Sequence, residues 1–298
     1  MMDKFVVAGP PFSVVDSDVA AAVAVERCLT SDLLGVDTET LGKKYTNMTD
    51  RAVCLSLCPD DDIRYFVPRE YMHHFAEVLS SEVPKACHNF GFDKHRLAND
   101  GIELDGPVLD GVMLDFLYDE DTRENRHGLK ECAKDYLGVV TPEYGELFGH
   151  VDVRLLVPGH ELYEKFVDYA SLDAWMHRAV CLYLSGKLKQ VSVDDDGWTL
   201  LDHYWNIEEQ QLKTLWRMER RGLRVNQEKA LTLSQRLKSR MAEIAFDFAR
   251  KAGRPLNPGS GQQLANYFHV DLGLPVVKRT PSGRASMDED VLESLVGQ

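Results

Sequence analysis

Three short apolar runs in the first quarter of the chain limit its fold more than any other feature. Residues 33–36, 52–58 and 63–67 are strand-like, and Pro59-Asp60-Asp61-Asp62 between the last two has the length and composition of a hairpin turn. They predict a three-stranded meander. Helical periodicity is found at residues 18–29, 71–80, 90–99, 128–137 and 162–184, and a further short strand at 85–87. We therefore expect an α/β domain.

The pattern changes after residue 193. The run from Val193 to Gly197 contains three aspartates, but it lacks the alternating ligands and closing glutamate of a calcium loop, so we interpret it as a linker. Beyond it, residues 198–221, 227–252 and 262–272 are helical in pattern. The sequence thus predicts two domains, residues 1–193 and residues 194–298, of which the second is smaller and mostly helical.

Charge is distributed unevenly over a chain whose net charge is −14. Residues 1–200 hold 19 Lys+Arg against 36 Asp+Glu, whereas residues 201–298 hold 15 against 12. Basic residues recur at helical spacing at Lys213, Arg217, Arg220, Arg221, Arg224, Arg236, Lys238 and Arg240. This series favours contacts with phosphate groups, although the interleaved glutamates leave open an ordinary solvated helix face with ion pairs.

The composition also indicates the compartment. No apolar run approaches the roughly 20 residues of a membrane helix, and the N-terminus lacks the order of a signal peptide. The six cysteines are scattered, without a CxxC pair, which indicates buried thiols in a reducing compartment. We expect a soluble cytoplasmic protein that has no membrane partner.

Two pairs of polar residues have spacings that place them on one face of an element. Asp37 and Glu39 follow the apolar run 33–36, so both leave the same face of a buried strand, where acids are costly unless a cation lies between them. Tyr169 and Asp173 stand four apart in an apolar helical segment and share one helix face. Taken singly, these pairs have ordinary explanations: a solvated strand end, a core tyrosine and a surface acid.

Asp93 lies just inside a helix that follows the short strand at 85–87. By itself it is a first-turn acid favoured by the helix dipole. Together with the two pairs, it completes a set of four acids and one tyrosine from three segments of one domain. A two-metal phosphodiester hydrolase needs such a set, because its ions lie about 3.5–4 Å apart and require several oxygen ligands.

Three segments resemble a known family. DTET at 37–40, NFGFD at 89–93 and YASLD at 169–173 resemble, in sequence and order, the exonuclease motifs of the tyrosine-bearing subclass of the DEDD superfamily. That subclass includes the proofreading domain of family A DNA polymerases, the bacterial polymerase I type. Residues 125–130 and 143–148 agree with it, and residues 218–226, 256–264 and 280–288 resemble the start of the polymerase thumb region. The resemblance implies a ribonuclease H-like domain, with a mixed central sheet flanked by helices, and a thumb-like region without palm or fingers.

The resemblance also implies roles for residues. Asp37, Glu39 and Asp173 would hold the ion that activates water, Asp37 and Asp93 would hold a second ion, and Tyr169 would orient the attacking water. Mg²⁺ or Mn²⁺ suits such an all-oxygen site. Substrate-binding positions by the same resemblance are Thr38, Thr40, Leu41, Asn89 and Phe92, for which plain packing is the alternative.

The function that follows is a two-metal 3′–5′ exonuclease acting on single-stranded or frayed DNA 3′ ends, as in proofreading during DNA replication. We expect it to bind single-stranded 3′ ends and primer–template DNA and to have no polymerase activity in this chain. Two alternatives stay open. One is an RNA exonuclease resembling ribonuclease D, and the other is a noncatalytic DNA-binding or assembly part of a split polymerase, with palm and fingers on a separate subunit.

Overall fold

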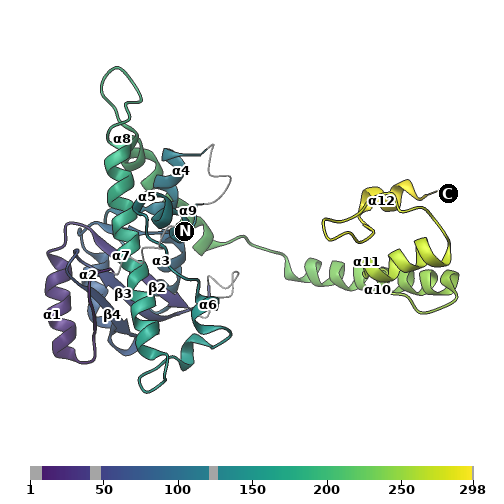
Figure 1. Cartoon of the computed structure of the whole chain (residues 1–298), viewed down its shortest axis with the longest axis horizontal. Coiled ribbons are helices and arrows are strands. Elements are labelled where there is room, and N and C mark those ends of the chain that lie inside the picture. Colours follow the sequence, from purple (N-terminus) through teal and green to yellow (C-terminus); the bar gives the residue numbers. More distant parts are fainter. Residues whose placement is uncertain (1–8, 41–47, 121–126, 297–298) are drawn as a thin grey trace, which may run out of the picture. The chain divides into compact units, whose positions relative to one another are not determined.

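The computed structural model describes residues 9–40, 48–120 and 127–296 (Figure 1). The chain divides into two compact units, Met1–Gly222 and Leu223–Gln298. The first contains the sheet and all of the residues predicted to form the active site, and the second is helical.

A mixed six-stranded sheet forms the centre of the first unit, in the order β1-β4-β3-β2-β5-β6. Its strands are β1 (Phe12–Val14), β2 (Leu34–Thr40), β3 (Ala52–Cys58), β4 (Arg64–Pro68), β5 (Lys85–Cys87) and β6 (Val108–Asp110). The predicted meander is confirmed, because β3 pairs antiparallel with both β2 and β4. In parallel pairs, β1 joins β4, β5 joins β2 and β6 joins β5. The two edge strands have three residues each, too few for an alternating pattern in the sequence.

Helices cover both faces of this sheet. They are α1 (Asp18–Leu29), η1 (Arg69–Phe75), α2 (Ala76–Ser80), α3 (Phe90–Asn99), α4 (Gly111–Tyr118), α5 (Leu129–Leu137), α6 (Tyr144–Phe148), η2 (Val153–Leu155), α7 (Tyr163–Leu188), α8 (Leu200–His203), η3 (Tyr204–Glu208) and α9 (Glu209–Arg221). Buried residues of α1, η1, α2 and α3 pack with Leu34 and Val36 of β2 in one core cluster. The long helix α7 crosses β2, β3, β4 and β5 on the opposite face (Figure 1).

Helix ends follow local chemistry. The Ser17 side chain accepts a hydrogen bond from the Ala20 backbone N–H and so caps α1, which has the bounds that the periodicity predicts. Helix α3 also has its predicted bounds, and α7 runs four residues past the predicted end at Leu184 to Leu188. The segment predicted as one helix at 71–80 begins instead as the 3₁₀ helix η1 and continues as α2.

The first compact unit ends later in the sequence than the predicted boundary at residue 193. Tyr204 is fully buried, and its hydroxyl donates to the Val108 carbonyl at 2.8 Å and accepts from the Asp110 N–H at 2.8 Å. Lys213 on α9 donates to the Gly106 carbonyl at 2.8 Å, and Arg220 donates to Asn99 Oδ1 at 2.6 Å. Helices α8 and α9 therefore complete the first unit, and this part of the predicted basic series contacts protein groups of that unit.

The second unit is formed by α10 (Gln227–Ala252), α11 (Gly261–Ala265), η4 (Asn266–Asp271) and α12 (Glu289–Ser294). Asn226 caps α10, and Gly253 ends it in the left-handed conformation with φ 70°. Residues 223–298 hold 11 Lys+Arg against 8 Asp+Glu, a net of +3, which leaves 23 against 40, or −17, for residues 1–222. The charge asymmetry found in the sequence is therefore kept at this boundary.

Two further expectations concern the cysteines and membrane-spanning helices. All six cysteines are buried free thiols, as predicted. Within the part of the chain that the structure describes, no helix has both the length and the apolar character needed to cross a membrane.

Truncation tests the position of this boundary. We expect a chain ending at Gly222 to keep the melting temperature of the first unit, whereas a chain ending at Gly197 should melt at a lower temperature. The shorter chain loses Tyr204, and removing a buried aromatic side chain costs about 3–5 kcal/mol. Thermal unfolding followed by circular dichroism measures both chains. Equal melting temperatures would show that α8 and α9 are not part of the folded unit.

Candidate metal centre

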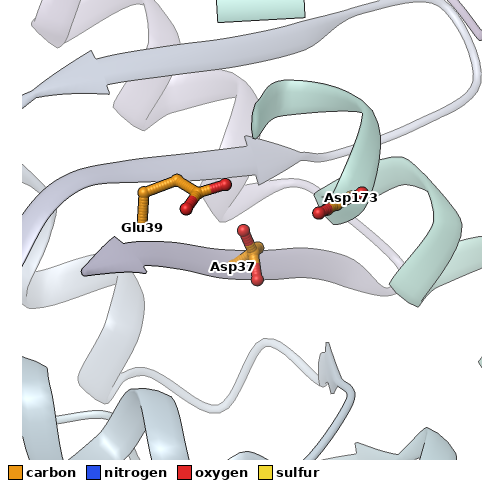
Figure 2. Close-up of side chains that lie close together, drawn as sticks. All are labelled: Asp37, Glu39 and Asp173. Carbon is orange, nitrogen blue, oxygen red and sulfur yellow. The ribbon is translucent and has the colours of Figure 1, made fainter. Parts of the chain in front are cut away.

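Strand β2 and helix α7 bring three carboxylates together. Along β2, Leu34 and Val36 enter the core on one face, so the alternate residues Asp37 and Glu39 lie on the other face, which α7 covers. One oxygen from each of Asp37, Glu39 and Asp173 lies within 4.8 Å of the others, and all three side chains are partly buried (Figure 2). The structure thus gathers three of the four predicted acids into one cluster.

Close docking of α7 on β2 sets the position of Asp173. A methyl group at Gly35 would overlap the carbonyl oxygen of Ala174, so only glycine allows this approach. His177 Nδ1 donates to the Val36 carbonyl at 2.7 Å, and Arg178 Nε donates to the Leu33 carbonyl at 2.9 Å. Burial lowers the pKa of His177 to about 3, so this imidazole is neutral. These contacts hold the helix turn that carries Asp173 against the strand that carries Asp37.

The electrostatics of the cluster favour a cation. Burial raises the pKa of Asp173 to about 7, and burial together with the charge of Asp173 raises the pKa of Glu39 to about 8. The pKa of Asp37 is also raised, first by burial and then by the neighbouring carboxylates. A divalent ion among these oxygens would remove the repulsion, and an all-oxygen donor set fits Mg²⁺ or Mn²⁺.

Asp93, the fourth predicted acid, lies beside this cluster and outside the group of three. It is 2% exposed on the first turn of α3, and its Oδ1 accepts hydrogen bonds from the Thr38 N–H at 3.1 Å and the Thr38 hydroxyl at 2.6 Å. Burial raises the pKa of Asp93 to about 7, although the Thr38 bonds act in the opposite direction. Its charge contributes to the raised pKa of Asp37, so the two carboxylates interact.

Asp110 anchors the helix that carries Asp93. Its carboxylate accepts from the backbone N–H of Phe90 at 2.6 Å, at the start of α3, and from that of Val112 at 2.9 Å, at the start of α4. The residue before α3, Asn89, has φ 75°, a left-handed conformation that asparagine tolerates better than most residues. Asp110 was not among the residues predicted from the sequence, although an aspartate directly before a helical segment is a capping signal.

The contact between Thr38 and Asp93 can be tested without changing side-chain shape. Thr38→Val should weaken hydrolysis by about tenfold, equivalent to about 1.4 kcal/mol, because Asp93 loses a hydrogen bond that favours its ionised form. Single-turnover cleavage measures the rate. Thr141→Val is the matched control, since the partly buried Thr141 hydroxyl has no hydrogen-bond partner among the described residues. An equal effect of the two substitutions would contradict a role for the Thr38 hydroxyl.

Tyr169 lies one turn before Asp173 on α7 and is partly buried. Its ring forms T-shaped pairs with the rings of Tyr144 and Phe148, with centroid distances of 6.0 and 5.6 Å. Lys130 Nζ on α5 lies 3.2 Å from the Tyr169 hydroxyl. Burial and the nearby carboxylates raise the pKa of Tyr169, so its hydroxyl keeps its proton at neutral pH. Lys130, Tyr144 and Phe148 belong to the two stretches that supported the family resemblance, but no role for Lys130 was predicted from the sequence.

The predicted substrate-binding residues have different surroundings. Thr38 is buried, Thr40 is partly buried at the end of β2, and Asn89 is exposed. Phe92 is partly buried, and the Arg96 guanidinium lies 3.6 Å from the centroid of its ring. Leu41 lies outside the described residues. For all five, a contact with substrate stays a prediction.

Comparison with known proteins gives one family and a shared fold. Residues 12–189 match the sequence profile of a family described as 3′–5′ exonuclease. DNA polymerase I of Chloroflexus aurantiacus is 26% identical over 304 residues, which cover 96% of this chain and 31% of that protein. This chain therefore spans about a third of the length of that curated relative.

Two solved structures are similar. The POL domain of Pol1 from M. smegmatis, in complex with DNA primer-template and dNTP, aligns with a TM-score of 0.61 and 21% identity over 95% of this chain and 45% of that chain. Trypanosoma brucei RNase D in complex with RNA U12 aligns with a TM-score of 0.55 and 15% identity over 69% of this chain and 70% of that chain. With the family match, these alignments confirm the ribonuclease H-like exonuclease fold expected from the sequence.

Proposed function

Because the chain belongs to the 3′–5′ exonuclease family related to family A DNA polymerase I, we propose that it hydrolyses phosphodiester bonds at single-stranded or frayed DNA 3′ ends. The observation that carries this proposal is the cluster of three partly buried carboxylates from β2 and α7. Proofreading is the proposed use of the reaction. Primer–template DNA, which the similar M. smegmatis structure contains, is the proposed partner.

In this proposal the carboxylates bind two Mg²⁺ or Mn²⁺ ions. Asp37, Glu39 and Asp173 hold one, and Asp37 and Asp93 hold the other. When bound, such ions activate water for attack on phosphorus and stabilise the leaving oxygen. Without a cation the raised pKa values of Glu39 and Asp173 keep part of the cluster protonated near neutral pH, so the ligand set is complete only where a cation replaces those protons.

Other side chains orient the reactants. Tyr169, protonated beside Asp173, offers a hydroxyl that directs the attacking water. The Phe92 ring, held against the Arg96 guanidinium, is proposed to stack on a terminal base, with Asn89 beside it. Thr38 and Asp110 act through Asp93 and the start of α3. The helical region after residue 193 is proposed to be thumb-like, and residues 223–298 would contribute the net positive charge for duplex phosphates.

Oligonucleotide digestion tests the proposal. With Mg²⁺ or Mn²⁺, 5′-labelled single-stranded DNA should give a ladder of shortened products, 3′-labelled DNA should release labelled mononucleotide, and EDTA should stop both reactions. Single-stranded RNA of the same sequence, and incorporation of nucleotides on primer–template DNA, are scored alongside. Shortening of RNA in place of DNA would favour the ribonuclease-D-like alternative. Binding of DNA without cleavage in either metal would favour a noncatalytic module.

A further inference from the structure

Lys130 on α5 is held by three acceptors near the carboxylate cluster. Its Nζ lies 2.8 Å from the Pro142 carbonyl, 3.2 Å from Glu143 Oε2 and 3.2 Å from the Tyr169 hydroxyl. An ammonium group has three N–H donors, so these three acceptors match its full capacity. The side chain is only 18% exposed, and Nζ also lies 4.8 Å from the centroid of the Tyr169 ring. The group is therefore more constrained than a lysine at the protein surface.

The contact with Lys130 determines the direction in which the Tyr169 hydroxyl donates its proton. An ammonium group donates hydrogen bonds and accepts none, whereas a phenol has one proton and two lone pairs. The Tyr169 oxygen therefore accepts from Lys130, and its single proton has to point away from Nζ. The charges that act most strongly on this hydroxyl are those of Asp173 and Glu39, which attract the proton toward the cluster.

Lys130 also acts on the cluster by its charge. Its ammonium lowers the pKa of both Glu39 and Asp173, against the larger effect of burial. An ammonium group that acts on two members of the cluster and bonds to Tyr169 is suited to more than holding Glu143, a residue whose side chain is 71% exposed. An ion pair with so exposed a partner contributes little to stability.

We propose that Lys130 is a positioning residue for hydrolysis: by donating to the Tyr169 oxygen, it directs the Tyr169 hydroxyl proton toward the carboxylate cluster and the water bound there. This inference rests on the proposed function. The alternative is a purely structural role, in which Lys130 only joins α5 to the segment at 142–143. Its removal would then affect stability and leave the reaction unchanged.

A double-mutant cycle separates these alternatives. Lys130→Met keeps the length of the side chain and removes its charge and donors, and Lys134→Met, an exposed lysine one turn further along α5, is the matched control. We expect Lys130→Met to lower kcat for single-stranded DNA by about tenfold or more, with KM within about threefold of wild type. In a Tyr169→Phe background the same substitution should lower kcat by less than about threefold, because the hydroxyl it orients is gone. Equal losses in both backgrounds would overturn the proposal.

Mn²⁺ affinity, measured by calorimetry, supplies a readout that does not depend on turnover. Removing a cation near the carboxylates should leave Mn²⁺ binding unchanged or make it tighter. A combined loss of Mn²⁺ affinity and kcat would show that Lys130 holds the site together structurally, against the proposal.

A spectroscopic measurement tests the contact between Lys130 and Tyr169 independently of the proposed function. In protein carrying ¹³C at the tyrosine ζ carbon, the resonance lost in Tyr169→Phe identifies Tyr169. Lys130→Met should move this resonance and Lys134→Met should not. If wild-type protein cleaves neither DNA nor RNA, the proposed function fails, whereas an unmoved resonance in Lys130→Met shows that the hydroxyl contact itself is absent.

Discussion

Glu39→Gln is expected to lower the rate of DNA hydrolysis by about 10³-fold or more, equivalent to about 4 kcal/mol of barrier. The amide has nearly the size of the carboxylate but supplies no charge to a divalent ion, while Asp37 and Asp173 stay in place. Single-turnover cleavage of 5′-labelled single-stranded DNA in Mg²⁺ measures the loss. Glu164→Gln is the control, since Glu164 is exposed in the first turn of α7.

The same variant should have the opposite effect on stability in EDTA. In wild type, Glu39 has a folded-state pKa of about 8, well above the usual value near 4.3, so its ionisation costs stability as pH rises between these two values. Glutamine does not ionise, so Glu39→Gln should gain in melting temperature over wild type between pH 5 and 8, and Glu164→Gln should not. Opposite changes in activity and stability are typical of a residue selected for function. Full activity in Glu39→Gln would remove this cluster from consideration as the catalytic site.

Structural features that depend on residues close together in sequence are predictable, whereas those that depend on distant residues are not. The bounds of α1 and α3 and the pairing of β2, β3 and β4 follow from periodicity and a hairpin turn, which are local. The first unit extends to Gly222, and within its last part Tyr204 bonds to backbone groups of β6, about 95 residues earlier in sequence. Neither periodicity nor a linker-like composition detects such a contact, so the sequence placed the boundary at residue 193.

In the candidate site, too, local relations are predictable from the sequence and long-range contacts are not. The alternation of side chains along a strand predicts that Asp37 and Glu39 share a face, and helical spacing predicts the same for Tyr169 and Asp173. The family resemblance led us to expect that these two faces meet. In the structure, one carboxylate oxygen from each of Asp37, Glu39 and Asp173 lies within 4.8 Å of the other two. Lys130 reaches Tyr169 across 39 residues of sequence, and no local pattern indicates this contact. That the carboxylates bind metal stays a prediction.

Gly35 is a sequence signal for the close contact between β2 and α7. A glycine inside an otherwise apolar buried strand commonly marks the close approach of another backbone. Here that backbone is the α7 turn at Ala174, directly after Asp173. The distance between the strand and the helix, and with it the distance between Asp37 and Asp173, depends on the absence of a side chain at this one residue.

Gly35→Ala is therefore expected to lower the free energy of unfolding by about 3 kcal/mol or more and to abolish most cleavage. The added methyl group overlaps the Ala174 carbonyl oxygen, and neither backbone can move without separating β2 from α7. A displacement of Asp173 by about 1 Å would by itself cost about 10²-fold in rate. Urea denaturation and cleavage normalised to the folded fraction measure the two effects separately. Gly186→Ala on α7 is the matched control, because among the described residues nothing beyond its chain neighbours and the adjacent helix backbone lies within 4 Å of the added methyl group. It should be neutral or more stable by up to about 1 kcal/mol. If Gly35→Ala instead folds and cleaves DNA as wild type does, the spacing of β2 and α7 does not control the site, and the carboxylate cluster tolerates a wider separation than its geometry implies.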